Sequence, residues 1–135
     1  MTTAAAARLK LATDTTLGLP KLPHIPEAWS DPLTHKQQEE NLLHVALWVV
    51  ERDLANFEMN YWHKDQNLDL RLTTETCGTT HCIAGFAQVM CGPKGFTTNP
   101  AAAGFFLLGR EAEFHFQDSN LDSLAFLKTV IDRNS

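Results

Sequence analysis

The chain has 135 residues, 44% of them hydrophobic, with eight Phe and three Trp, which fits one folded domain with its own core and excludes a disordered chain. The net charge is −5 at pH 7 and no cluster of Lys or Arg stands out, which argues against nucleic acid or an anionic membrane as the partner. No apolar run approaches the roughly 18 residues of a membrane span and the N-terminus lacks the apolar core of a signal peptide, so we expect a cytoplasmic protein.

Residues 1–33 are predicted to form an extended N-terminal arm. Pro20, Pro23 and Pro26 are three apart, a spacing that favours extended or polyproline-like backbone. Residues 4–12 have the composition of two helical turns, but isolated helices of this length are marginal in water. The arm is expected either to dock on a partner or on a second copy of the chain, or to lie over its own domain through Leu19, Leu22, Ile25 and Trp29.

Residues 34–135 are predicted to form the helical domain, and its first helix has the clearest signals. Thr34 and Gln37 have the spacing of a capping box, in which each side chain bonds the backbone N–H of the other residue. His44 and Trp48 are four apart and therefore share a face, where we expect contact with the arm. The helix is predicted to reach Phe57 because apolar residues recur at helical spacing: Leu42, Leu43, Ala46, Leu47, Val49, Val50, Leu54 and Phe57.

A second helix is predicted over about 79–91. Thr79 or Thr80 is expected to cap it, and Gly92-Pro93 to end it. Its strongly polar side chains are limited to His81 and Gln88, and a helix that is apolar on all sides is buried. One side is thin and would let a neighbouring helix approach closely, because it carries small residues: Ala84, Gly85 and Ala87.

The C-terminal part is predicted to hold three more helical segments. Asn99 and Pro100 open a helix that stops at Gly109, a short helix occupies residues 110–116, and Ser119 or Asn120 caps a last helix over about 121–132. The last helix is expected to bury Leu121, Leu124, Ala125, Leu127, Val130 and Ile131. The fold expected from these patterns is a compact all-α domain of four to five helices, with helix 79–91 buried at its centre.

The turn from Cys77 to Cys82 contains the best candidates for a reactive site. Cys82 lies near the start of a predicted helix, whose positive end lowers a thiol pKa and favours a nucleophilic thiolate. His81 is a poorly placed base for it, because adjacent helical residues project about 100° apart. Two interpretations of Cys82 therefore stay open. It is either an inert core residue or, as the alternative, a catalytic nucleophile that acts with His81 and Cys77.

Three further interpretations of the same turn stay open. Cys77, His81 and His63 are ligand types that zinc accepts, although their spacing is poor for it. Cys77 and Cys82 could form a disulfide, although an odd number of cysteines fits free thiols in a reducing cytosol better. The backbone N–H groups of Gly78, Thr79 and Thr80 could hold an anion, and no cofactor is indicated.

Three groups of residues carry a resemblance to a known set of proteins. They are Phe57, Met59 and Trp62 in an F-x-M-x-x-W pattern; then Cys77, Gly78, Thr79, Cys82, Ala84, Gly85 and Ala87 in a C-G-T-x-x-C-x-A-G-x-A pattern; then Leu107, Leu108 and Gly109. The chain resembles, over residues 41–132, a group of small bacterial and phage proteins with no established activity, with Phe86 where Trp is commoner. The resemblance implies a helical domain and an origin in a bacterium or a phage.

The function favoured by the sequence is non-enzymatic. We expect an accessory protein that binds a protein partner, or its own copy, through the N-terminal arm. The alternative is a small enzyme or a ligand-binding or metal-binding domain that uses the Cys77–Cys82 turn.

Overall fold

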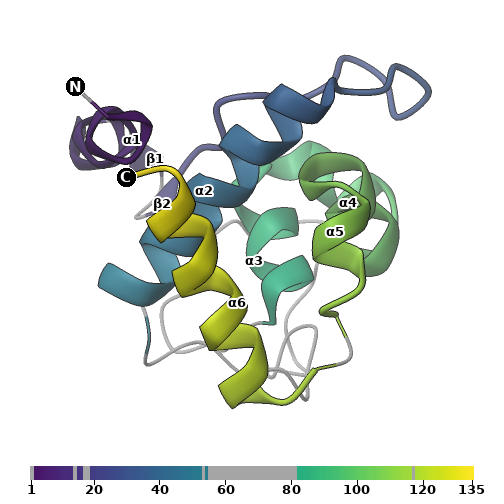
Figure 1. Ribbon diagram of the computed structural model, residues 1–135. Coiled ribbons are helices and arrows are strands. Elements are labelled where there is room, and N and C mark those ends of the chain that lie inside the picture. The colour runs from purple at the N-terminus through teal and green to yellow at the C-terminus, as the bar shows by residue number, and fades with distance from the viewer. Residues whose placement is uncertain (1, 14, 17–18, 53, 55–81, 117) are drawn as a thin grey trace.

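The computed structural model describes residues 2–13, 15–16, 19–52, 54, 82–116 and 118–135. These residues are mostly helical and pack as one compact all-α domain around helices α2 and α3 (Figure 1). The described elements, in chain order, are α1 (Thr3–Thr13), β1 (Thr15–Thr16), β2 (Leu19–Pro20), α2 (His35–Glu51), α3 (Ile83–Met90), the 3₁₀ helix η2 (Pro93–Thr97), α4 (Pro100–Leu108), α5 (Arg110–Glu113) and α6 (Asn120–Arg133). The predicted fold class is confirmed.

Helix α2 begins as predicted and ends earlier than predicted. Thr34 and Gln37 form the capping box, with the Gln37 N–H donating to Thr34 Oγ1 over 3.1 Å. The helix ends at Glu51, whereas the apolar pattern predicted a continuation to Phe57. Leu54, predicted to face inward, is 50% exposed. Residues 55–57 of the predicted continuation lie outside the described residues.

Helix α3 is the buried centre of the domain, as its composition predicted. All of its side chains are buried, and it lies among α2, α4 and η2. It begins at Ile83 with Cys82 as the N-cap, so the prediction that Thr79 or Thr80 caps it is wrong. Its end at Gly92 is confirmed, because Gly92 takes a positive φ of 81° that favours glycine.

The approach of α4 to α3 is close at Gly104. A Cβ built at Gly104 would lie 2.9 Å from Ala84 Cβ and 2.7 Å from Phe116 Cζ, so only glycine fits without displacement of its neighbours. The predicted thin side of α3 therefore meets a thin side of α4.

The caps of α4 and α6 are those expected from the sequence. Asn99 accepts from the Ala102 N–H, and Ser119 accepts from the Asp122 N–H. On α6 the predicted inward face is only partly correct, because Leu121 is 78% exposed and Ala125 is exposed, whereas Phe126 is buried. Leu121 lies in the first turn of α6, in which Ser123 is buried.

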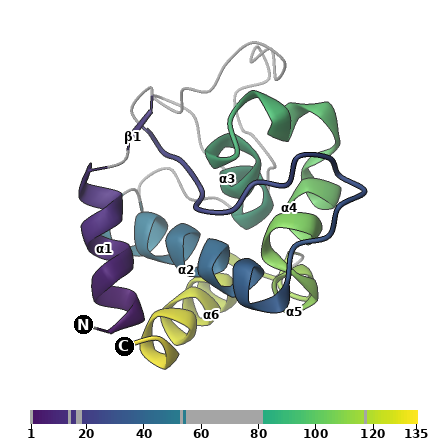
Figure 2. The same cartoon turned by 90° about the horizontal axis from the view of Figure 1, so that it is seen from above.

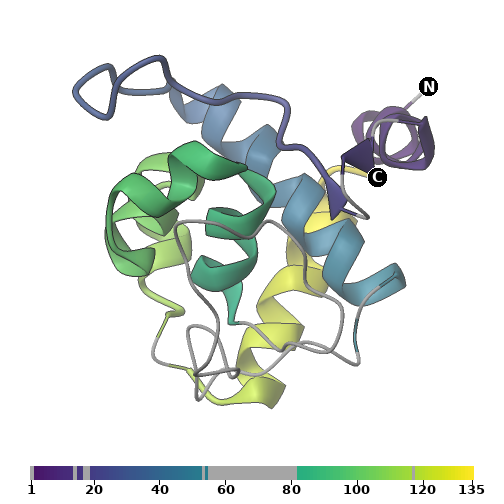
Figure 3. The same ribbon diagram turned by 180° about the vertical axis from the view of Figure 1, so that it is seen from behind.

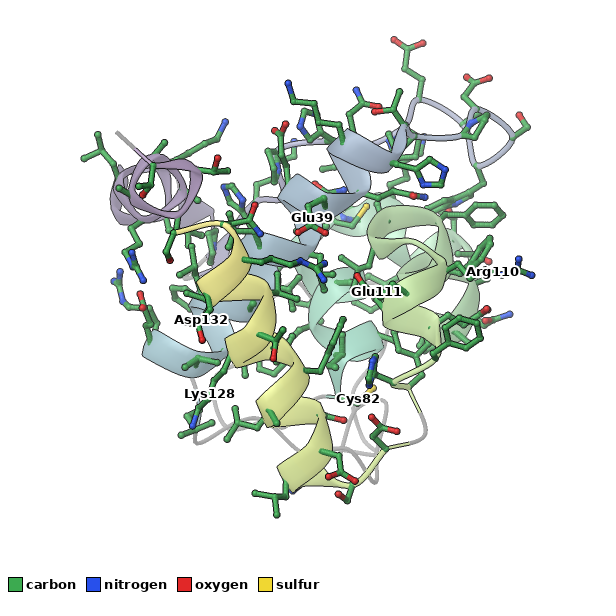
Figure 4. All side chains as sticks on the ribbon, viewed as in Figure 1. Glu39, Cys82, Arg110, Glu111, Lys128 and Asp132 are labelled. Atoms are coloured by element: carbon green, nitrogen blue, oxygen red, sulfur yellow. The ribbon has the colours of Figure 1, made fainter. Side chains whose placement is uncertain are left out.

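The C-terminal end of α6 is tied to two other helices. Arg133 bonds Glu39 of α2 at 2.5 and 2.8 Å, and Glu111 of α5 at 2.6 and 2.9 Å. Glu39 and Glu111 face the space between these three helices (Figure 4). The hydrogen bond from Arg133 lowers the pKa of the Glu111 carboxyl.

The N-terminal region contains a helix, whereas the sequence indicated only a segment whose helix would be marginally stable in isolation. Helix α1 buries Ala4, Ala7 and Leu11, spaced three and four residues apart, and packs on α2. Tertiary burial of this stripe supplies the stability that so short a helix lacks alone. β1 and β2 then pair antiparallel, Thr15 with Pro20 and Thr16 with Leu19. The two chain ends lie side by side, where the Ala4 N–H donates to the Asn134 carbonyl (Figure 2).

The remainder of the arm lies over the domain. Leu22, Ile25 and Trp29 pack against the core, as one of the two interpretations of the arm predicted. Figure 2 shows the arm crossing α3 and α4 before it turns back into α2. The boundary between arm and domain at residues 33 and 34 stays a prediction. No helix of the described residues is long and apolar enough to cross a membrane.

Candidate functional site

Cys82 is the member of the predicted reactive turn that the structure describes. It lies at the lower end of α3 in Figure 4. Its side chain is 1% exposed, and its Sγ accepts the Gly85 N–H over 3.3 Å as the N-cap of the helix. Burial raises the pKa of Cys82 to about 11, and the hydrogen bonds from the helix N–H groups only partly offset that rise. The predicted lowering of this pKa is therefore wrong, because desolvation outweighs the helix end.

The other residues of the predicted site lie outside the described part of the chain. These are His63, Cys77, Gly78, Thr79, Thr80 and His81. The zinc, anion and nucleophile interpretations that depend on them stay predictions. Within the described ranges, no group of three or more His, Cys, Asp or Glu could hold a metal ion. Cys82 and Cys91 are both buried free thiols, and burial also raises the pKa of Cys91 to about 11.

We expect the thiol of Cys82 to react slowly with iodoacetamide in the native protein. A pKa of about 11 in place of 9.0 leaves about a hundredfold less thiolate at neutral pH, and burial also blocks access. Mass spectrometry of peptides after timed labelling would measure the rate at each cysteine, with the urea-unfolded chain as the reference. A Cys82 that labels faster in the native protein than in urea would contradict this account and restore the nucleophile interpretation.

The N-terminal arm is the second predicted functional element, and its middle is fixed by one buried side chain. The Asn41 side chain of α2 accepts the His24 N–H at 3.0 Å and donates to the His24 carbonyl at 2.9 Å. It also donates to the Leu107 carbonyl of α4 at 2.9 Å. Nearby, the Leu22 N–H donates to the Met90 carbonyl at the end of α3. The arm thus bonds α2 and α3 directly, and the same Asn41 side chain bonds α4.

The arm then projects from the body as a loop over residues 27–32 (Figure 3). The loop is anchored at two of its residues, Glu27 and Trp29. Lys94 Nζ donates to the Glu27 carbonyl, and Trp29 Nε1 donates to Thr97 Oγ1 over 2.7 Å. The Trp29 ring also packs against Phe106, with 5.9 Å between the ring centroids. The Trp29 side chain therefore fixes the exposed part of the loop to the domain.

A cluster of two histidines and a carboxylate lies where the arm meets α2. His24 Nε2 lies 2.7 Å from Glu40 Oε2. His44 Nδ1 lies 2.9 Å from the Glu40 carbonyl, which can only accept, so Nδ1 carries the proton. Burial lowers the pKa of His44, so this ring is neutral at pH 7. Contact between His44 and the arm was expected from the helical pattern, but His24 and Glu40 carried no motif that singled them out.

No family model, curated protein or solved structure matches this chain. The resemblance to small bacterial and phage proteins accordingly stays a prediction. The described residues contain a buried Cys82 whose pKa is raised and an arm that is held by hydrogen bonds at His24 and Trp29.

Proposed function

We propose that this chain is a non-enzymatic accessory protein that acts by binding, and that the loop over residues 27–32 of its N-terminal arm contacts the protein partner or the second copy. Neither nucleic acid nor a membrane is the expected target, because the loop carries Glu27 and Asp31 and the chain has a net charge of −5.

The proposal is supported by a loop that projects from the domain and is at the same time held in place. Glu27, Ala28, Ser30 and Asp31 are exposed, while Trp29 between them is held by Thr97 and Phe106. A surface that is already ordered loses little conformational entropy when it binds, so its contacts translate more fully into affinity. A loop without such anchors would be a weaker candidate.

Site-specific photo-crosslinking tests this assignment. A photoreactive phenylalanine analogue would replace Ser30 in the loop or, as the control, Lys128 on the exposed face of α6. After irradiation in cells of the source organism, mass spectrometry would identify the adducts. We expect one discrete adduct that forms from position 30 and is absent from position 128.

The mass of that adduct separates the two kinds of partner. An adduct of two identical chains indicates self-association, which sedimentation velocity between micromolar and millimolar concentration would verify. An adduct with one other protein indicates a heterologous partner, whose loss on the Asp31→Arg exchange and retention on the control Glu113→Arg exchange would verify the contact. Equal or absent crosslinking from both positions would overturn the proposal.

A further inference from the structure

His44 of α2 lines a pocket of about 270 Å³ that lies between α1, the arm and α2. Although it borders this pocket, the residue is only 5% exposed. The pocket is also lined by α1, through Thr3, Ala6, Ala7 and Lys10, and by the arm, through Pro23 and His24. The N-terminal segments of the chain thus help to cover a titratable side chain of α2.

The hydrogen bonds of the His44 ring suit its neutral form. Nδ1 lies 2.9 Å from the Glu40 carbonyl and donates its proton there. Nε2 is buried and has no hydrogen-bond partner among the described residues. A second proton, on Nε2, would create a buried positive charge whose N–H meets neither an acceptor nor water, and such a charge is far more costly to bury than the neutral ring. The folded arrangement therefore favours the neutral ring.

The charged groups that act on the ring belong to the same segments that line the pocket. Among the described residues, Lys10 of α1 and a charged His24 of the arm oppose a proton on His44, whereas Glu40 of α2 favours one. The Glu40 carboxylate also lies 2.7 Å from His24 Nε2. Burial is the largest influence, ahead of the hydrogen bond to the Glu40 carbonyl, and it lowers the pKa of His44.

We infer that protonation of His44 releases α1 from α2, so that the N-terminal helix is a cover that opens in mildly acidic solution. Release lets water reach Nε2 and takes the positive charge of Lys10 away from the ring. A proton then binds the open form more tightly than the closed form, and by linkage it favours opening. This device is separate from the projecting loop and does not depend on the function proposed for it.

Of the two segments that cover His44, α1 is the more weakly held. Its buried stripe consists of two alanines and one leucine, and a helix of 11 residues is marginal by itself. Its ion pair with α2, from Arg8 to Glu51 at 3.0 Å, is exposed and contributes little. The arm, in contrast, is fixed at His24 by two hydrogen bonds to the buried Asn41 side chain. Figure 2 shows α1 at the edge of the domain, where it can leave without disturbing α3.

Hydrogen exchange of the full chain at pH 7.5 and pH 5.5 tests the inference. Mass spectrometry would give the opening constants of α1 and α3, after each rate is divided by the intrinsic exchange rate at that pH. We expect α1 to open more often than α3 at both pH values, because its release is a local event. The opening constant of α1 should rise about tenfold at pH 5.5, since a released histidine titrates near its usual pKa of about 6.5 and the covered one titrates lower.

A matched pair of histidine variants identifies the group that senses pH. The side-chain amide of His44→Asn can still donate to the Glu40 carbonyl but cannot take up a proton, so α1 should open equally often at both pH values. His35→Asn, at the exposed first residue of α2, is the control and should keep the tenfold rise. Circular dichroism would establish that both variants are folded.

Three results would overturn the inference. One is an opening constant of α1 that does not rise at pH 5.5. Another is an opening constant of α1 that equals that of α3 at both pH values, which would mean that the helix leaves only when the whole domain unfolds. The third is a tenfold rise that persists in His44→Asn, which would assign the response to another group such as His24. The comparison of α1 with α3 in the wild-type chain decides the matter even where a variant fails to fold.

Discussion

Gly95→Ala is expected to lower the free energy of unfolding by about 3 kcal/mol, because a side chain at this position has no room. A Cβ built at Gly95 would overlap the Gln88 carbonyl oxygen and lie 3.0 Å from the Gln88 carbonyl carbon and 3.2 Å from Cys91 Cβ. The obstacle is the backbone of α3, the buried central helix, which cannot turn aside as a flexible side chain would. Urea unfolding followed by circular dichroism would measure the loss.

Gly92→Ala is the matched control for that exchange. Gly92 has no atom within 4 Å of a built Cβ, but its φ is 81°, so the cost there is conformational only and should be about 1 kcal/mol. Comparable losses in the two variants would show that η2 can move away from α3, and that the close contact at Gly95 is not what restricts this position to glycine.

Asn41→Leu is expected to destabilise the protein by a similar amount, about 3 kcal/mol, through lost hydrogen bonds and not through lost volume. The exchange removes all three bonds of the Asn41 side chain and leaves the His24 N–H and two carbonyls without this partner. The penalty is large because the site is fully buried and a leucine offers no polar atom. Chemical denaturation would give the magnitude.

Hydrogen exchange gives the same variant a second, local readout. The amides of Leu22 and His24 should exchange faster in Asn41→Leu than the amides of α3, since the backbone of the arm at His24 loses both of its hydrogen bonds to the Asn41 side chain. Thr129→Val is the control, because it removes one exposed side-chain hydrogen bond, to the Ala125 carbonyl, and should cost no more than about 0.5 kcal/mol. Uniform exchange of arm and core in Asn41→Leu would mean that Asn41 does not hold the arm in particular.

Most helix starts and stops that depend on neighbouring residues were predictable from the sequence. Thr34, Asn99 and Ser119 each cap a helix by accepting an N–H three positions on. Gly92 and Gly109 end helices through positive φ angles. Such interactions need only a few residues of chain, so the residue types at fixed offsets carry the information.

The errors have two causes, which are a cap residue of unusual type and burial by segments that are distant in the sequence. Cys82 caps α3 at the same three-residue offset as the other caps, but cysteine is not a typical cap residue, so its type did not predict this role. The helix end that was expected to activate this thiol cannot do so, since burial acts on the pKa more strongly. Leu121 has the spacing of a core residue but is 78% exposed, whereas Ser123 in the same turn of the helix is buried.

By itself, the sequence determined the all-α fold, the buried central helix and most helix caps, because short-range hydrogen bonding and apolar periodicity are local properties of the chain. Only the tertiary structure decided that the arm contains a helix, that Asn41 fixes it, and that Lys10, His24, Glu40 and His44 line one pocket. These features join α1, the arm and α2, and the free energy that holds them together comes from burial between segments distant in sequence, which no local pattern encodes.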